Sequence, residues 1–153
     1  MRRSGSCSGS LQVTVTNLQR TIPINVIGLT RFAVGAARFC LQIRKSKPTD
    51  LTRLTEILVL LVSDRRMAGL HRQFLGRSGS TDVLTFQHGE IFISAETAQR
   101  NAGRFRNKLG RELRLYIVHG LLHLHGFDDQ DPASSRKMRK VQERILAQAG
   151  ALN

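Results

Sequence analysis

Two histidines four residues apart, His119 and His123, have the spacing in this sequence that most directly indicates chemistry. In a helix, side chains four positions apart lie on one face, one turn apart, so two imidazoles can converge on one metal ion. Neutral imidazole is a good ligand for zinc and related transition metals. Leucines surround the pair, which favours a partly buried site.

The residues that follow the pair could complete such a site. His125 lies about 200° around a helix from His123, so we expect it to point elsewhere. Gly126 is suited to end the helix in a left-handed conformation, after which either Asp128 or Asp129 could supply a carboxylate. Two histidines and one carboxylate leave a position open for water, which is typical of a catalytic zinc site.

The alternative interpretation is a pair of core histidines on an apolar helix. A metallopeptidase helix carries Glu as general base after its first histidine, whereas this chain has Gly120 there.

Two carboxylates elsewhere in the chain are further candidates for the site. Asp82 could orient a ligand or a water, or it could simply stabilise a turn. Glu90 could act as general base, or be an exposed carboxylate at a strand end. The remaining histidines, at positions 71 and 88, are expected on the surface.

Charge is the strongest feature of the composition. The 153 residues include 24 Lys and Arg against 11 Asp and Glu, a net charge of +13. Such an excess indicates an anionic partner, for which nucleic acid is the first candidate and a membrane surface the rival. Two basic runs flank the histidine pair and could follow an RNA backbone: Arg100, Arg104, Arg106, Lys108, Arg111 and Arg114, and then Arg136, Lys137, Arg139 and Lys140.

The two cysteines, Cys7 and Cys40, have no metal-type spacing and are not expected to form a disulfide framework, which favours a reducing compartment. No apolar run approaches the length of a transmembrane helix. The polar stretch after Arg2 and Arg3 is unlike a signal peptide. We therefore expect a cytoplasmic protein.

The elements that must position the histidines follow from hydrophobic periodicity. Residues 1–10 are polar and are predicted to be a disordered N-terminal extension, and residues 11–150 a single metallohydrolase domain. Strands are expected over 11–16, 57–62, 83–86 and 90–94, and helices over 25–42, 65–75, 95–106, 110–125 and 133–149.

These elements predict an α/β protein of the α+β type. About four mixed strands would form a single layer against about five helices, with the metal-site helix towards the C-terminal half. The continuous apolar run 57–62 indicates a central strand covered on both faces. The short link between 83–86 and 90–94 indicates a hairpin, and Asp131-Pro132 is a helix start signal.

Three segments, in order, resemble the YbeY family of metal-dependent endoribonucleases specific for single-stranded RNA. They are His119-Gly-Leu-Leu-His123-Leu-His-Gly-Phe-Asp-Asp129, Phe74-Leu-Gly-Arg-Ser-Gly-Ser-Thr-Asp82-Val-Leu-Thr-Phe86 and Gly89-Glu90-Ile-Phe-Ile-Ser94. The resemblance covers roughly residues 11–150. It implies one Zn²⁺ per chain, with Mn²⁺ as a possible substitute, and a role in ribosomal RNA maturation and ribosome quality control. The implied partners are single-stranded RNA, ribosomal RNA and the small ribosomal subunit.

The resemblance also implies site residues, with two departures. It assigns His119, His123 and Asp129 as metal ligands, although the family's usual third ligand is histidine. A carboxylate is a harder ligand, so the site should prefer zinc less strongly. The family's arginine for the RNA phosphate corresponds to Leu75 here. Arg77 or Arg72 could supply that cation, and Arg77 therefore joins Asp82 and Glu90 as a candidate catalytic residue.

Two other functions stay open from the sequence. A non-catalytic ribosome-assembly factor would keep the metal only for structure, and Leu75 is the best argument for it. A metallopeptidase-like hydrolase would share the histidine pair, but Gly120 and the charge of +13 argue against it.

Overall fold

A computed structural model of the protein describes residues 10–75 and 82–151, so most of the predicted N-terminal extension lies outside the described residues. The strands are β1 (Gln12–Asn17), β2 (Glu56–Val62), β3 (Val83–Thr85) and β4 (Glu90–Ser94). The helices are α1 (Val26–Leu41), α2 (Asp50–Arg53), α3 (Asp64–Leu75), α4 (Ala95–Arg104), α5 (Leu109–Leu124) and α6 (Pro132–Gly150). This arrangement confirms the predicted α+β class.

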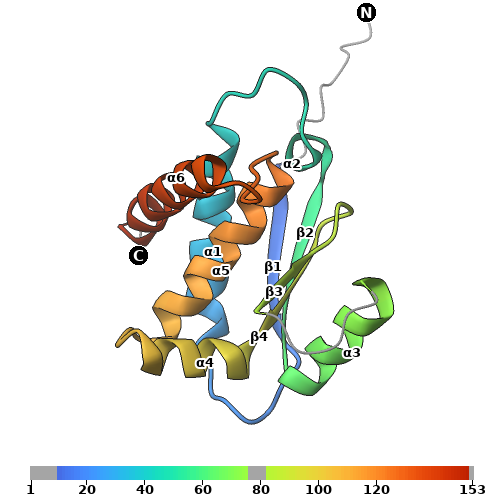
Figure 1. The fold of residues 1–153 in the computed structure, drawn as a ribbon, viewed down its shortest axis with the longest axis vertical. Coiled ribbons are helices and arrows are strands. Elements are labelled where there is room, and N and C mark those ends of the chain that lie inside the picture. The colour runs from blue at the N-terminus through green and yellow to red at the C-terminus, as the bar shows by residue number, and fades with distance from the viewer. Residues whose placement is uncertain (1–9, 76–81, 152–153) are drawn as a thin grey trace, which may run out of the picture.

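The four strands form one mixed sheet in the order β1-β2-β4-β3. β1, β2 and β4 are parallel, whereas β3 is an edge strand antiparallel to β4, which confirms the predicted hairpin. Helices α1 and α5 cover one face of the sheet, α6 packs on both of them, and α3 lies against β4 on the other face (Figure 1). The protein therefore has helices on both faces of a single sheet.

Successive side chains of each strand point to opposite faces of the sheet, and this divides the core into two clusters. Ile57, Val59 and Leu61 of β2 are fully buried and join the main cluster with α1 and α5. The intervening Leu58 and Leu60 are only half-buried, because α3 covers just part of the opposite face. The prediction of a central strand is confirmed, but its second face is less covered than the apolar run suggested.

Local signals explain where the helices begin. The Asp131 carboxylate accepts a hydrogen bond from the Ser134 backbone N–H at 2.8 Å, and Pro132 is the first residue of α6, as the start signal predicted. Helix α2 is not among the helices predicted from the sequence. Thr49 and Thr52 form a reciprocal capping box at its start, and a threonine at the last position lacks the Glu or Gln that marks this motif in a sequence.

Two further features concern a cysteine of the core and the apolar character of the helices. Cys40 is a free, buried cysteine, and burial raises the pKa of its thiol to about 12, which leaves it unreactive. Cys7 lies outside the described residues. In residues 10–75 and 82–151, no helix has both the length and the apolar character needed to cross a membrane.

A partly buried carboxylate joins the start of α3 to α4. Asp64 accepts hydrogen bonds from Ser94 Oγ at 2.5 Å, Thr97 Oγ1 at 2.7 Å and Arg100 Nη1 at 2.6 Å. Burial alone would raise the pKa of this carboxyl, but hydrogen bonds from Arg100, Ser94 and Thr97 outweigh it and lower the pKa to about 2. The ionised form therefore stabilises the junction between the two helices.

Replacing Asp64 with Asn should lower the free energy of unfolding by roughly 2 kcal/mol near neutral pH. Because the folded-state pKa is depressed, this stabilisation is present above about pH 4 and is lost as the pH falls toward about 2. Denaturant titrations across this range should show the two proteins converging at low pH. Glu143→Gln is the control, since its pair with Arg111 is half exposed on both sides and should contribute little. Equal losses in the two variants would contradict the assignment.

Candidate metal centre

Helix α5 brings His119 and His123 together as their spacing predicted. Their Nε2 atoms lie 2.9 Å apart, and the ring centroids 4.5 Å apart. The helix can lie close to the sheet because Gly120 has no side chain: a Cβ there would be 2.9 Å from Ile91 Cγ2 and 3.1 Å from Thr85 Oγ1. The two imidazoles are half-buried and keep one side open to solvent.

The Nδ1 atoms of both rings face hydrogen-bond acceptors, and this fixes the protonation of the two Nε2 atoms. His119 Nδ1 lies 2.9 Å from Gln142 Oε1, and His123 Nδ1 lies 3.1 Å from the Phe127 carbonyl oxygen. Each Nδ1 must therefore carry the proton and donate it. In the neutral rings both Nε2 atoms then present lone pairs to each other, an arrangement that is repulsive unless a cation or a proton lies between them.

The turn after α5 brings a carboxylate to the same point. Gly126 has a φ of +84°, and the chain around it forms the two hydrogen bonds of a Schellman motif. Phe127 N–H donates to the Leu122 carbonyl at 3.0 Å, and Gly126 N–H to that of His123 at 3.1 Å. Asp129 Oδ2 consequently lies 3.7 Å from His119 Nε2 and 3.9 Å from His123 Nε2.

The neighbouring candidates have other partners. His125 is buried: its Nε2 donates to the Ile43 carbonyl at 2.8 Å, and its Nδ1 accepts from Thr49 Oγ1 at 2.9 Å. Its side chain thus connects the end of α5 to the loop before α2. Asp128 Oδ1 accepts a hydrogen bond from the Gln130 backbone N–H at 3.0 Å. Of the residues left open by the sequence, Asp129 is the one that lies beside the histidine pair.

The arrangement fits a divalent metal ion. One ligand atom from each of His119, His123 and Asp129 lies within 4.8 Å of the others, and ligands around tetrahedral zinc lie roughly 3.3–3.5 Å apart. Burial first, and then the charge of His119, lower the pKa of His123, which favours the neutral, ligating form. The donor set also leaves solvent access on one side, as a catalytic site requires.

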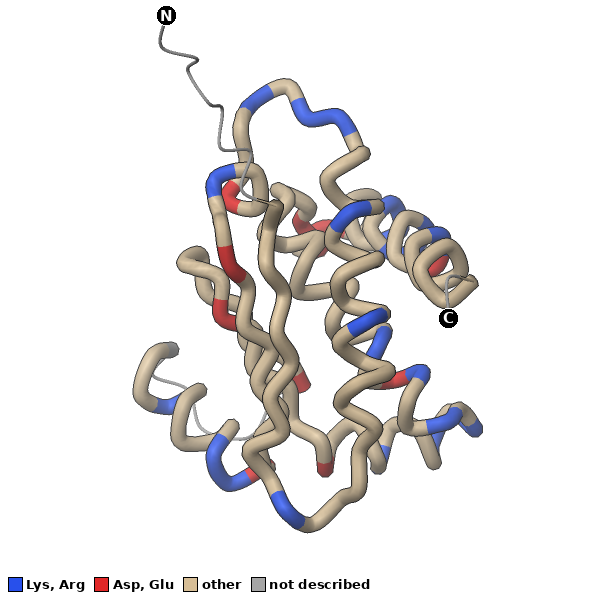
Figure 2. The backbone as a smooth tube through the Cα atoms, turned by 180° about the vertical axis from the view of Figure 1, so that it is seen from behind, with Lys and Arg blue, Asp and Glu red and all other residues tan. Residues whose placement is uncertain are grey.

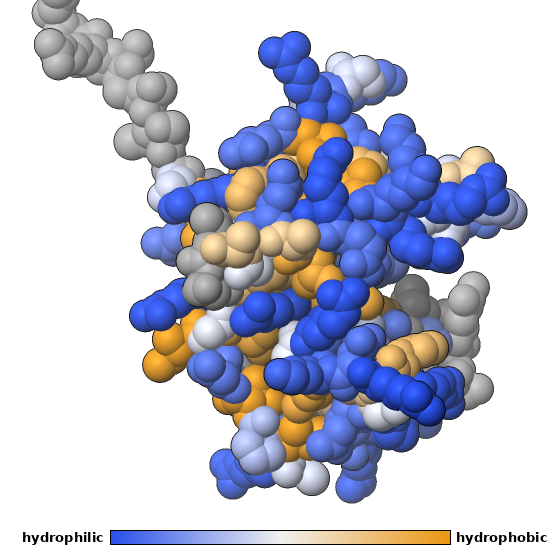
Figure 3. Space-filling model, turned by 90° about the vertical axis from the view of Figure 1, so that its left-hand side faces the viewer, coloured by the Kyte–Doolittle hydropathy of each residue, from blue (hydrophilic) through white to orange (hydrophobic). Residues whose placement is uncertain are grey.

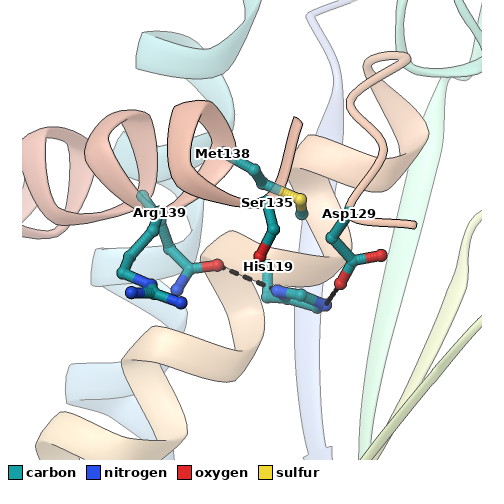
Figure 4. Close-up of a pocket in the computed structure, with 6 residues that line it drawn as sticks. His119, Asp129, Ser135, Met138 and Arg139 are labelled. Carbon is teal, nitrogen blue, oxygen red and sulfur yellow. Dashed lines mark hydrogen bonds and ion pairs between the residues drawn. The ribbon is translucent and has the colours of Figure 1, made fainter. Parts of the chain in front are cut away.

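Helix α6 forms a wall beside the triad. A cavity of about 190 Å³ is lined by His119 and Asp129 on one side and by Ser135, Met138, Arg139 and Gln142 of α6 on the other (Figure 4). Met138 is buried and closes the wall, whereas the other three α6 side chains present polar groups. The open side of the triad therefore faces a polar pocket.

Two of the other predicted site residues, Glu90 and Asp82, have hydrogen-bond partners outside the triad. The Glu90 side chain lies on the face of the sheet opposite to α5. Its carboxylate is 3.0 Å from His88 Nε2, beside an aromatic pocket. Asp82 Oδ1 accepts from the Val83 backbone N–H, and its charge acts on Tyr116, about one turn before His119. Arg77 lies outside the described residues.

Gln142 contacts the triad directly, and the sequence analysis did not single it out. It lies on α6, and its contact with His119 joins positions 23 residues apart. No local spacing marks such a pair; a polar residue within the apolar face of α6 is the signal that could have indicated it.

Replacing Gln142 with Leu should weaken metal binding by about 10–100-fold, because the His119 ring loses the acceptor that fixes its tautomer and orientation. Gln142→Glu keeps an acceptor and should retain affinity. Competition with a chromogenic chelator measures the effect. Gln148→Leu is the matched control on an exposed part of the same helix, and a similar loss in that variant would argue against a specific role for Gln142.

Comparison with known proteins agrees with this geometry. The family model for endoribonuclease YbeY matches residues 14–150. An endoribonuclease YbeY from Anaeromyxobacter sp. (strain Fw109-5) is 42% identical over 107 residues, which covers 63% of this chain and 55% of that relative. Relatives of the same name from Frankia alni and Pelotomaculum thermopropionicum are 31% and 33% identical, covering 90% and 94% of this chain and 82% and 98% of their own.

A solved structure shares the fold. The solution structure of TM1509 from Thermotoga maritima matches with a TM-score of 0.63 and 24% identity, covering 90% of this chain and 88% of that one. The match supports the arrangement of sheet and helices described above. With the family model spanning nearly all described residues, the chain belongs to the YbeY endoribonuclease family.

Proposed function

We propose that this chain is a metal-dependent endoribonuclease that cuts single-stranded RNA in the maturation of ribosomal RNA and in ribosome quality control. Membership of the YbeY endoribonuclease family supports RNA cleavage. The proposal includes one Zn²⁺ per chain, which Mn²⁺ could replace, a cytoplasmic location, and ribosomal RNA and the small ribosomal subunit as partners.

The observation that carries the proposal is the pair of facing Nε2 lone pairs with Asp129 beside them. A divalent ion held there would supply Lewis acidity to a phosphate group and to an attacking water. The donor set of two imidazoles and one carboxylate suits zinc and its neighbours.

The chain's own residues prepare the site in separate ways. Gln142 and the Phe127 carbonyl hold the two rings so that both Nε2 atoms face inward. The backbone hydrogen bonds of the Schellman turn restrain the segment that carries Asp129, and a restrained ligand loses less entropy when an ion binds. The α6 wall leaves room for substrate next to His119.

The surface charge supports an RNA substrate. Lys and Arg recur along the outer helices and the loop after α1, with few acidic residues between them (Figure 2), and the side of the molecule carrying α6 is mainly hydrophilic (Figure 3). Two members of the predicted basic runs have acidic partners, since Arg100 pairs with Asp64 and Arg111 with Glu143. The others stay candidates for phosphate contacts, which dominate affinity for single strands.

The two alternative functions predict different outcomes in one assay. We expect purified protein to cut an unstructured RNA, to lose this activity with a chelator, and to regain it with Zn²⁺ or Mn²⁺. A duplex of the same sequence and an unstructured peptide should stay intact. Chelator-sensitive cleavage of the peptide would instead identify a metallopeptidase. Metal-loaded protein that binds RNA but cuts neither substrate would identify an assembly factor.

A further inference from the structure

One face of α6 points at the candidate metal centre. Ser135, Met138, Arg139 and Gln142 occur at helical spacings of three and four and line the same cavity as His119 and Asp129. Met138 is buried against the core, and Gln142 holds His119. Ser135 and Arg139 are left as polar groups in this wall with no role in holding the triad.

Arg139 is an arginine with no charged or hydrogen-bonded partner in the part of the chain that the structure describes. In residues 10–75 and 82–151, its guanidinium makes no ion pair or hydrogen bond with another described residue, unlike those of Arg100 and Arg111. The nearby Glu143, one turn further along α6, is paired with Arg111 instead. In Figure 4 the Arg139 side chain extends from α6 beside the His119 ring, while Asp129 approaches that ring from the other side.

We infer that Arg139 binds the phosphate of the RNA strand next to the bond that is cut, with Ser135 as a further donor. The inference rests on the proposed function and names the residue of that site that recognises the substrate. A guanidinium offers a planar pair of N–H donors that match two phosphate oxygens. Its position opposite Asp129 makes the cavity a slot, with the metal ligands on one wall and a cation on the other.

The charges that line the slot favour an anionic ligand. Two neutral imidazoles and one carboxylate around a divalent ion leave a net positive charge, and Arg139 adds another. The cavity is open to solvent at Asp129, whose side chain is 41% exposed, so a phosphate group of a strand on the surface can reach it. A phosphodiester satisfies both the unpaired guanidinium and the charge of the loaded centre.

The test compares Arg139→Gln with Arg144→Gln, an exposed arginine on the far side of the same helix. Binding of a labelled oligouridine of about 12 nucleotides is measured by fluorescence anisotropy in excess chelator, so that no cleavage occurs. Arg139→Gln should bind about tenfold more weakly, with a log–log salt slope smaller by about 0.7. Arg144→Gln should stay within about twofold of the parent.

A second arm uses metal-loaded protein and separates this inference from the proposed function. Arg139→Gln should lower kcat/KM for the RNA by at least about tenfold, and Arg139→Lys, which keeps the charge but loses the planar fork, should recover only part of it. If the parent cuts RNA and Arg139→Gln matches it in both arms, the inference is wrong and the function stands. If the parent does not cut but Arg139→Gln alone weakens binding, the function fails and the phosphate site stands. Equal weakening in the Gln variants at 139 and 144 would overturn the inference, because it would show a diffuse helix charge.

Discussion

Replacing both His119 and His123 with alanine should remove the metal from the protein and reduce RNA cleavage to background. The two Nε2 atoms are the inner donors of the triad, and Asp129 alone is an exposed carboxylate that does not hold an ion firmly. Metal catalysis is worth several kcal/mol, so we expect the rate to fall by more than roughly a thousandfold. Elemental analysis and a cleavage assay measure the two losses together.

The control for this variant is His88→Ala, which removes an exposed histidine on the opposite face of the sheet. Its metal content and activity should equal those of the parent. A thermal unfolding scan in chelator should show that the double variant is still folded. Full metal occupancy in the folded double variant would mean that the ion binds elsewhere in the chain.

Replacing Asp129 with alanine should cost metal affinity and activity together, whereas changes at its two neighbouring candidates should not. Asp129 Oδ2 lies within 4 Å of both ligand nitrogens. The Asp128 carboxylate is occupied by the Gln130 N–H, so Asp128→Ala should bind metal normally. His125→Ala should lower stability by about 1–3 kcal/mol, because the partner groups of this buried side chain lose their hydrogen bonds, yet keep most of its metal affinity.

Asp129→His completes this series. A third imidazole should restore binding and shift the preference from manganese toward zinc, because imidazole is the softer ligand. Titration of each variant with Zn²⁺ and Mn²⁺, alongside RNA cleavage, gives the comparison. If Asp129→Ala matched the parent while Asp128→Ala or His125→Ala lost metal, the third ligand would have been assigned wrongly.

The parts of the site that the sequence predicts are those within one short segment. The facing histidines, the glycine stop and the return of a carboxylate all follow from the backbone geometry of residues 119–129, where spacing determines position. Glu90 differs, because its distance from α5 depends on the face of β4 from which its side chain projects. Ile91 next to it faces Gly120, so alternation directs Glu90 to the other side.

The parts that the sequence does not predict are tertiary. The strands and five longer helices follow from periodicity, since each buries one face. Gln142 and Arg139 reach the site only because α6 packs across α1 and α5. The spacing of residues within α6 does not indicate that the face carrying these two side chains will lie beside the histidines. Helix α2 was missed for a local reason, because its start is capped by two threonines.

The close packing at Gly120 limits how this family's scaffold can change its chemistry. A peptidase of the histidine-pair type needs a glutamate at this position, and here the first carbon of any side chain would meet Ile91 and Thr85 at about van der Waals contact or closer. The added side chain would begin against the side chains of β3 and β4. Acquiring that base would require the Ile91 and Thr85 side chains, or helix α5 itself, to shift. On this scaffold, a change at position 120 toward a peptidase base is therefore coupled to the packing of α5 against β3 and β4.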